Sequence, residues 1–220
     1  MNRSHDERLA QFQSAGLYLV SSAAASAGRP TLDILGAALD AGVTLIQLRE
    51  KELAARDYFT LAEKARALTH RYGALLILND HLDVALAVEA DGVHLGQEDF
   101  PVGAARRIAP RLLLGVSTHS LPEALAAQEQ GASYVNIGPL FPTTTKQWAG
   151  AFLGWNGLES IAPHLAIPFS VMGGIKTEHI PGLVQRGARV IALVTAVTAA
   201  PDPAAAARAL LEKIRLSACS

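Results

Sequence analysis

Charged side chains suited to binding phosphate and metal follow separate aliphatic runs of the chain. Arg49 and Lys51 follow one run, Asp80 follows the next, and Asp99 lies 99 − 80 = 19 residues further on. Arginine offers a planar fork to phosphate and lysine a compact positive charge. Carboxylates are hard oxygen ligands, which Mg2+ takes together with substrate phosphates. These residue types indicate a site for a phosphorylated small molecule and Mg2+.

Each of these residues also has a structural explanation. Arg49 and Lys51 could form a solvated charge pair, Asp80 could cap the following helix, and Asp99 could be a turn residue. Alternation along a strand, however, places Gln47, Arg49 and Lys51 on one side, so they could converge on one anion.

Two histidines and a glycine pair occupy comparable positions. His94 could be a buried, hydrogen-bonded histidine or a ligand contact, and the residues favour neither. His119 follows Ser117, but no Ser/His/Asp order accompanies it, so nucleophilic catalysis is not expected. Gly173-Gly174 could form a tight turn or present backbone N–H groups to a phosphate. Its place after the seventh predicted strand favours phosphate binding.

Alternating strand-like and helix-like segments must position these residues. The predicted strands are near-continuous aliphatic runs, typical of parallel strands buried on both faces. They cover 16–21, 44–49, 74–79, 92–96, 112–117, 134–139, 168–173 and 189–195. Their starts are about 25 residues apart, enough for a strand, a helix and two short loops.

Eight such units predict an α/β fold with one domain, a (β/α)8 barrel over 16–217 that follows an N-terminal extension over 1–15. A doubly wound open sheet is the alternative. An apolar stripe predicts a helix over 56–72, and Pro201-Asp202-Pro203 predicts the start of the last helix. Gly73, Gly131 and Gly187 are predicted helix ends.

The composition excludes several classes of protein. Of 220 residues, 50% are hydrophobic, which excludes a disordered chain, and the net charge is −1. We therefore expect neither nucleic acid nor a membrane as partner. The single cysteine, Cys219, cannot form an internal disulfide, and the first residues lack the apolar stretch of a secretory signal. A cytoplasmic protein is expected, and exposed aliphatic helix faces would permit a homo-oligomer.

Taken in order, these segments resemble the signatures of the thiamine phosphate synthase family. The resemblance runs from Gly16 to about Leu211. It rests on Gln47-Leu48-Arg49-Glu50-Lys51, Asn79-Asp80, residues 90–99 and 115–119, Gly138-Pro139 and Pro142-Thr143-Thr144-Thr145-Lys146. It implies a (β/α)8-barrel transferase of thiamine biosynthesis. Such an enzyme joins a hydroxymethylpyrimidine diphosphate to a thiazole phosphate, carboxylated or not, and releases pyrophosphate.

The resemblance also implies a role for each site residue. The residues that would hold the pyrimidine diphosphate are Gln47, Leu48, Arg49, Glu50, Lys51, Asn79, Ser117 and Lys146. Among them, Arg49, Lys51, Ser117 and Lys146 would be catalytic. Asp80 and Asp99 would bind Mg2+. The thiazole phosphate would be held by Thr143, Thr144, Thr145, Gly174, Val194 and Thr195. The chain departs from the family pattern at Thr195, where serine is usual, at His81, where arginine is frequent, and over 152–155.

Three other functions fit parts of the pattern. A thiazole tautomerase would share the barrel, but it has no diphosphate to activate and would not need Asp80 and Asp99 with Lys146. A phosphosugar isomerase or epimerase would need a proton-shuttling carboxylate or histidine, and none stands out. A non-catalytic sensor of a thiazole or pyrimidine phosphate would not need the metal and diphosphate residues.

Overall fold

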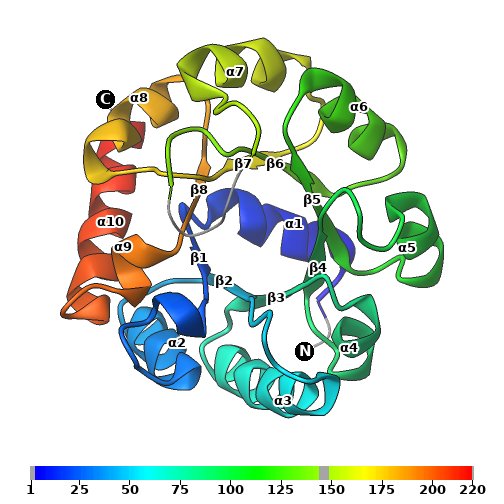
Figure 1. Cartoon of the computed structure of the whole chain (residues 1–220), viewed down its shortest axis with the longest axis vertical. Coiled ribbons are helices and arrows are strands. Elements are labelled where there is room, and N and C mark those ends of the chain that lie inside the picture. The colour runs from blue at the N-terminus through cyan, green and yellow to red at the C-terminus, as the bar shows by residue number, and fades with distance from the viewer. Residues whose placement is uncertain (1–2, 144–148, 220) are drawn as a thin grey trace.

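Eight aliphatic runs form the strands of a closed parallel barrel in the computed structural model, which describes residues 3–143 and 149–219. The strands are β1 (Leu17–Val20), β2 (Leu45–Leu48), β3 (Leu75–Asn79), β4 (Gly92–Leu95), β5 (Leu113–Thr118), β6 (Tyr134–Ile137), β7 (Phe169–Val171) and β8 (Val190–Leu193). Each strand pairs with the next, and β8 pairs with β1 (Figure 1). The predicted (β/α)8 barrel is confirmed, and the open sheet is excluded because β8 closes on β1.

Helices surround the barrel on its outer side (Figure 1). They are α2 (Thr31–Asp40), α3 (Ala55–Arg71), α4 (Leu82–Ala87), α5 (Val102–Ile108), α6 (Leu121–Glu129), α7 (Gly154–Ile161), α8 (Ile180–Gln185), α9 (Thr195–Thr198) and α10 (Pro203–Ala218). Short 3-10 turns cover Ala23–Ala25, Ala162–His164 and Thr177–His179.

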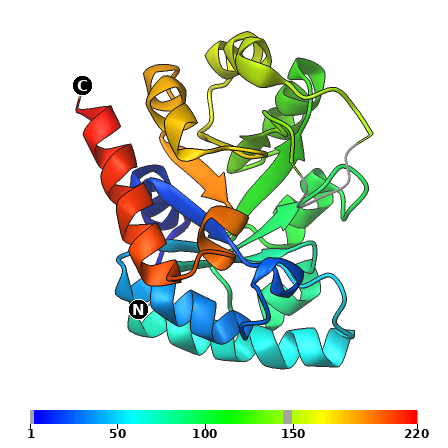
Figure 2. The same ribbon diagram turned by 60° about the vertical axis from the view of Figure 1, so that its left-hand side comes forward.

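The two helices predicted by sequence begin and end within a few residues of the expected positions. The predicted helix over 56–72 is α3, and the last predicted helix is α10. The Asp202 side chain accepts a hydrogen bond from the Ala205 N–H at 2.9 Å, and Pro203 occupies the first turn of α10. Figure 2 shows α10 along the outside of the barrel, where it contacts α2 and α8. The predicted helix ends at Gly73, Gly131 and Gly187 all have positive φ.

Two apolar layers result from the alternation of side chains along the strands. The outer layer lies between strands and helices and includes Leu48, Leu76 and Val93. The inner layer fills the barrel itself and includes Leu75 and Leu113. The barrel is therefore a packed core, and a ligand can be placed only beyond the strand ends.

The segment before the first strand closes the amino-terminal end of the barrel. Helix α1 (His5–Ser14) begins with a capping box between Ser4 and Glu7 and lies in the middle of the ring of helices (Figure 1). Phe12 is fully buried and stacks on Tyr134 with ring centroids 4.1 Å apart. The Arg8 guanidinium donates to the Arg111 carbonyl at 2.8 Å. The extension is thus packed against the barrel.

A buried carboxylate at the same end is surrounded by arginines. Asp91 is 1% exposed, and its oxygens lie 3.3 Å from Arg8 Nε, 3.2 Å from Arg66 and 3.8 Å from Arg3. It also accepts from the Leu76 N–H at 3.0 Å. Burial lowers the pKa of Arg8, and the charge of Asp91 opposes this shift. The cluster joins the N-terminal segment, α3 and the barrel.

Within the described residues, no helix has the length and hydropathy needed to cross a membrane.

Candidate active site

A cavity of about 540 Å³ opens at the carboxyl ends of the strands. A volume of this size suits a small-molecule ligand, and this end is where barrels of this type build active sites. Every strand, or the residue directly after it, contributes to the wall: Val20, Gln47, Asn79, His94, Ser117, Asn136, Met172 and Ala192. The cavity is therefore shaped by the whole barrel rather than by one loop.

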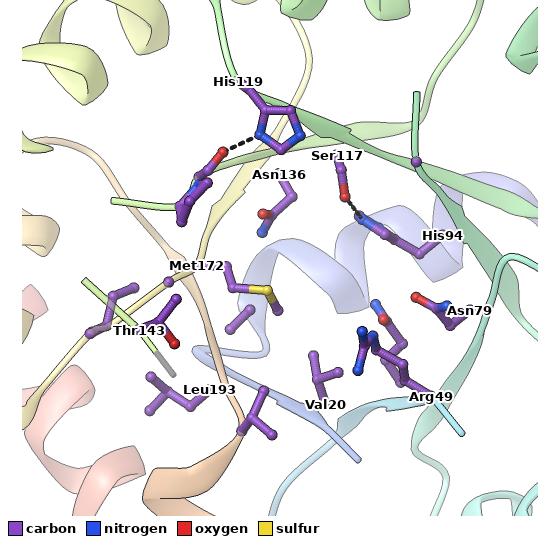
Figure 3. Close-up of a pocket in the computed structure, with 18 of the residues that line it drawn as sticks. Val20, Arg49, Asn79, His94, Ser117, His119, Asn136, Thr143, Met172 and Leu193 are labelled. Carbon is purple, nitrogen blue, oxygen red and sulfur yellow. Dashed lines mark hydrogen bonds between the residues drawn. The ribbon is translucent and has the colours of Figure 1, made fainter. Parts of the chain in front are cut away.

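The two sides of the cavity differ in their side chains. Figure 3 shows Arg49, Asn79 and His94 on one side and Thr143 and Leu193 on the other. The first side is polar and carries a positive charge, whereas the second combines an apolar side chain with a hydroxyl. Two ligands of different character could be held side by side.

Most of the predicted site residues that the structure describes line this cavity. They are Gln47, Arg49, Lys51, Asn79, Asp80, Asp99, Ser117, Thr143, Gly174, Val194 and Thr195. The structure thus brings together residues that the sequence spreads over almost 150 positions, 195 − 47 = 148. Their individual roles stay predictions.

Leu48 and Glu50 are buried side chains outside the wall of the cavity. Leu48 is fully buried in the outer apolar layer. The Glu50 carboxylate accepts from the Ala23 N–H and the Thr31 hydroxyl, each at 2.8 Å, and so ties the loop after β1 to the start of α2. Alternation turns these two side chains away from the cavity, and their predicted contacts with a ligand stay predictions.

Thr144, Thr145 and Lys146 lie outside the described residues. Thr143, the residue before them, lines the cavity. The predicted contacts of the other three with the phosphates stay predictions.

Two carboxylates and a lysine meet at the polar side of the cavity. Lys51 Nζ lies 3.5 Å from Asp80 Oδ2. Burial raises the pKa of Asp80, and the neighbouring carboxylate of Asp99 raises it further, whereas Lys51 lowers it. Two carboxylates this close repel each other unless a proton or a cation lies between them.

These residues fit a bound Mg2+. The neighbouring carboxylates of Asp80 and Asp99 both line the cavity, and a divalent cation between them would relieve the repulsion that raises the pKa of Asp80. The described residues contain no group of three or more His, Cys, Asp or Glu side chains suited to a metal. A site with two carboxylates suits Mg2+, which commonly completes its coordination with water and substrate phosphate oxygens.

Of the two structural roles considered for the aspartates, helix capping by Asp80 is absent and turn formation by Asp99 is present. Asp80 does not cap α4, since the N-cap is His81 and no side chain caps that helix. Its backbone lies in the left-handed region, with φ 64°, directly after β3. Asp99 does stabilise a turn, because its Oδ2 accepts from the Gly96 N–H at 2.6 Å. That bond fixes the carboxylate at the end of β4, beside Asp80.

Hydrogen-bonded side chains form the floor of the cavity. His94 Nε2 lies 2.9 Å from Ser117 Oγ, and His94 Nδ1 lies 3.1 Å from the Tyr134 hydroxyl (Figure 3 shows the first contact). Burial lowers the pKa of His94 to about 4. The imidazole is therefore neutral near pH 7, and His94 is at once a satisfied buried histidine and a wall of the cavity.

His119 and Asn136 complete the polar wall. His119 Nδ1 donates to the Gly138 carbonyl, as the dashed line in Figure 3 marks. The Asn136 amide donates to the Ser170 hydroxyl at 2.8 Å. Both side chains are fixed by their neighbours and line the cavity.

Gly174 lies where the loop after β6 passes close to the end of β7. Its φ is 59°, and a Cβ at this position would overlap the carbonyl oxygens of Pro142 and Phe141. A tight turn with positive φ is therefore present, as the structural explanation required. Gly174 also lines the cavity, so a tight turn and phosphate binding by backbone N–H groups are compatible at this position.

Several residues of the wall were given no individual role in the sequence-based prediction: Val20, Gln97, Glu98, Asn136, Met172, Ile175, Ala192, Leu193 and Ala196. Strand periodicity could have found Asn136. It lies two residues after Tyr134, which points into the barrel, and so it faces the same way. Gln97 and Glu98 lie in a loop, where no periodicity applies.

The fold and the cavity define a class of protein: a (β/α)8-barrel protein with a ligand site at the carboxyl ends of its strands. A family model described as thiamine monophosphate synthase matches residues 17–197. The thiamine-phosphate synthase of Chloroflexus aurantiacus is 48% identical, with 88% of this chain and 90% of that protein covered. The thiamine-phosphate synthase of Moorella thermoacetica is 45% identical, with 90% and 95% covered.

A solved structure agrees. The thiamine phosphate pyrophosphorylase of Pyrococcus furiosus superposes with a TM-score of 0.85 and 35% identity, covering 93% of this chain and 98% of that chain. The chain belongs to the thiamine monophosphate synthase family.

Proposed function

We propose that this cavity catalyses the Mg2+-dependent joining of a hydroxymethylpyrimidine diphosphate to a thiazole phosphate, giving thiamine monophosphate and pyrophosphate. The observation that carries the proposal is the carboxylate pair, Asp80 and Asp99, beside Lys51 at the mouth of the cavity. The family and the names of its members supply the substrates. The protein is a transferase in this proposal, and its partners are small phosphorylated molecules.

The pyrimidine diphosphate would lie on the polar side of the cavity. Its diphosphate would meet Arg49, Lys51 and Mg2+ held by Asp80 and Asp99, and its ring would rest on Gln47, Asn79 and Ser117 at the floor. Gln47 and Asn79 are 3% and 8% exposed, so a ring that reaches them is largely removed from water. Lys146 would approach the diphosphate from the loop after β6.

The thiazole phosphate would lie on the opposite side. Gly174 follows β7 and Val194 follows β8, and both line the cavity. Phosphate sites at this place recur in barrels of this type because backbone N–H groups and a short helix start there. The Thr195 hydroxyl would replace the serine usual in the family, and Thr143 to Thr145 would contribute from the neighbouring loop.

The reaction breaks one carbon–oxygen bond and forms one carbon–nitrogen bond. The thiazole nitrogen gives its lone pair to the methylene carbon, and the electrons of the breaking bond leave on pyrophosphate. No proton has to be removed from that nitrogen, so this step needs no general base. The positive groups Arg49 and Lys51 would stabilise the growing negative charge. When bound, Mg2+ would neutralise more of it.

The electron-rich aminopyrimidine can carry the positive charge that remains on the methylene carbon. This supports a dissociative displacement, in which the bond to pyrophosphate breaks before the new bond is complete. Largely buried side chains such as His94 and Asn136 would keep water from that carbon and hold the two rings close together.

The test is to incubate the protein with both phosphorylated substrates, with Mg2+ or with EDTA, and to measure pyrophosphate and thiamine monophosphate. We expect the two products in equal amounts, and only with Mg2+. Conversion of a thiazole phosphate isomer without pyrophosphate would identify a tautomerase instead. Binding of either substrate without any product would identify a sensor. Isothermal calorimetry showing no response to Mg2+ and pyrimidine diphosphate together would overturn the proposal.

A further inference from the structure

A chain of buried hydrogen bonds crosses the barrel beneath the cavity. Gln47 Nε2 donates to the Tyr18 hydroxyl at 2.7 Å, and the hydroxyls of Tyr18 and Tyr134 lie 2.9 Å apart. Tyr134 then meets His94 Nδ1, and His94 Nε2 meets Ser117 Oγ. The chain starts on β2 and ends on β5, and both of its ends line the cavity.

The direction of the first hydrogen bond fixes the direction of the others. Since the Tyr18 oxygen accepts from Gln47, its own hydrogen is available for Tyr134, and the Tyr134 hydrogen is then available for His94 Nδ1. A neutral imidazole that accepts at Nδ1 carries its hydrogen on Nε2. That hydrogen is donated to Ser117 Oγ, so the Ser117 hydrogen is not used within the chain.

The reverse direction would leave a buried hydrogen without an acceptor. If Ser117 donated to His94, then His94 would donate to Tyr134 and Tyr134 to Tyr18, whose own hydrogen would meet the N–H of Gln47. Tyr18 and Tyr134 are both fully buried, so an unsatisfied hydroxyl there costs about 1–3 kcal/mol. The recorded Gln47 contact therefore favours one direction.

Tight packing holds the chain in place. Tyr134 is stacked on Phe12 of α1 and approaches His94 across Gly115, where a Cβ would overlap the Tyr134 ring. Burial raises the pKa of both Tyr18 and Tyr134, which keeps each hydroxyl protonated. Neither tyrosine lines the cavity, so neither can touch a ligand there.

We propose that Tyr18 and Tyr134 are positioning residues that hold His94 with its hydrogen on Nε2 and thereby direct the Ser117 hydroxyl hydrogen into the cavity. Ser117 then presents a donor, and it selects a substrate ring with an acceptor nitrogen at that place. The effect on catalysis rests on the proposed function, whereas the hydrogen position on His94 does not.

The first experiment measures the His94 tautomer in the ligand-free protein by long-range 1H–15N correlation after 15N labelling of histidine. The chain has seven histidines, so a His94→Gln variant identifies the signal that belongs to His94. We expect a neutral ring with the hydrogen on Nε2. A hydrogen on Nδ1 would overturn the proposal, even if the protein is an active synthase.

The second experiment compares Tyr134→Phe with Tyr58→Phe. Tyr58 is also buried, but its hydroxyl donates to the Leu48 carbonyl at 2.9 Å, outside the chain of hydrogen bonds. We expect Tyr134→Phe to populate the second tautomer of His94 and Tyr58→Phe to leave the spectrum of the parent. A tautomer change in both variants, or in neither, would contradict a specific role of Tyr134.

The kinetic result separates positioning from general damage. In Tyr134→Phe, we expect KM for the pyrimidine diphosphate to rise about 3- to 10-fold, the value of one hydrogen bond. We expect KM for the thiazole phosphate to change less than about twofold, since its predicted site lies on the opposite side. An equal rise in both values would contradict the proposal. If neither the parent nor the variant forms pyrophosphate, the proposed function fails and the tautomer measurement still decides the inference.

Discussion

Asp80 is the residue on which the proposed chemistry of the cavity depends most directly. It is held in a left-handed backbone conformation, and burial and the neighbouring Asp99 carboxylate raise its pKa. Asparagine and aspartate are among the few residues that adopt this conformation without large strain. A change of charge at this position can therefore be made without disturbing the fold.

We expect Asp80→Asn to lower Mg2+-dependent turnover by about 100-fold, because one of the two predicted metal ligands loses its charge. The free energy of unfolding should stay the same or rise, since the repulsion from Asp99 is removed. Turnover is measured over a Mg2+ titration, and stability by urea unfolding. Asp83→Asn, an exposed aspartate three residues further on, is the control. Equal turnover of Asp80→Asn and the parent at limiting Mg2+ would contradict the metal role.

His94 makes the stability of the fold depend on pH. Its pKa is lowered by burial from 6.5 to about 4, so between these values the unfolded chain binds a proton that the folded chain does not. This contribution to stability is complete above pH 6.5 and is lost as the pH falls toward 4.

We expect the free energy of unfolding of the parent to fall by about 2 kcal/mol more than that of His94→Gln between pH 7 and pH 5. Glutamine has no titratable group, so the remaining pH dependence of the variant belongs to other residues. Urea unfolding at both pH values measures the difference. Parallel pH dependence of the two proteins would show that His94 does not titrate in this way.

At the scale of strands and loops, sequence reasoning succeeded where periodicity applies. Runs such as 74–79 are aliphatic throughout because β3 is buried on both faces, and this pattern located all eight strands. The predicted ends extend one or two residues too far in most cases, because the residues that flank the strands do not mark where strand pairing stops. Glu50 belongs to the motif over 47–51, but its side chain does not line the cavity. A motif identifies neighbours in the sequence and does not tell on which face of the strand each side chain lies.

Contacts between distant segments could not be predicted. Nothing in residues 1–15 indicates that Phe12 stacks on Tyr134, because the two residues are 134 − 12 = 122 positions apart. The buried chain from Gln47 to Ser117 likewise joins residues of five separate strands. Such contacts arise only when the barrel closes.

The loop between β6 and α7 carries Lys146, which is predicted to contact the diphosphate. We expect Lys146→Ala to lower kcat by at least about 10-fold while the Kd for thiazole phosphate changes less than about threefold, because the lysine is assigned to the leaving diphosphate. Steady-state kinetics and calorimetry measure the two values. Lys64→Ala, an exposed lysine on α3, should change neither. Weaker thiazole phosphate binding with unchanged kcat at saturation would reassign Lys146 to the second substrate.

At the scale of the whole molecule, the N-terminal segment and the barrel form one structure. The cluster around Asp91 joins Arg3, Arg8 and Arg66 from two parts of the chain. Removing the carboxylate charge leaves the buried Arg8 and the partly exposed Arg3 and Arg66 without their common anion.

We expect Asp91→Asn to lower the free energy of unfolding by about 3–5 kcal/mol, the usual effect of breaking a buried ion pair from one side. The site is at the opposite end of the barrel, so turnover of the folded fraction should stay within about twofold of the parent. Urea unfolding and the pyrophosphate assay measure the two quantities. A loss below about 1 kcal/mol would show that the arginines do not depend on Asp91.

Helix α1 closes the amino-terminal end of the barrel, and this limits the routes by which ligands can reach the cavity. Because Phe12 fills the amino-terminal end, both substrates and both products of the proposed reaction would pass through the opening at the carboxyl ends of the strands. In the proposed reaction, the two substrates would therefore approach their sites from the same side of the barrel.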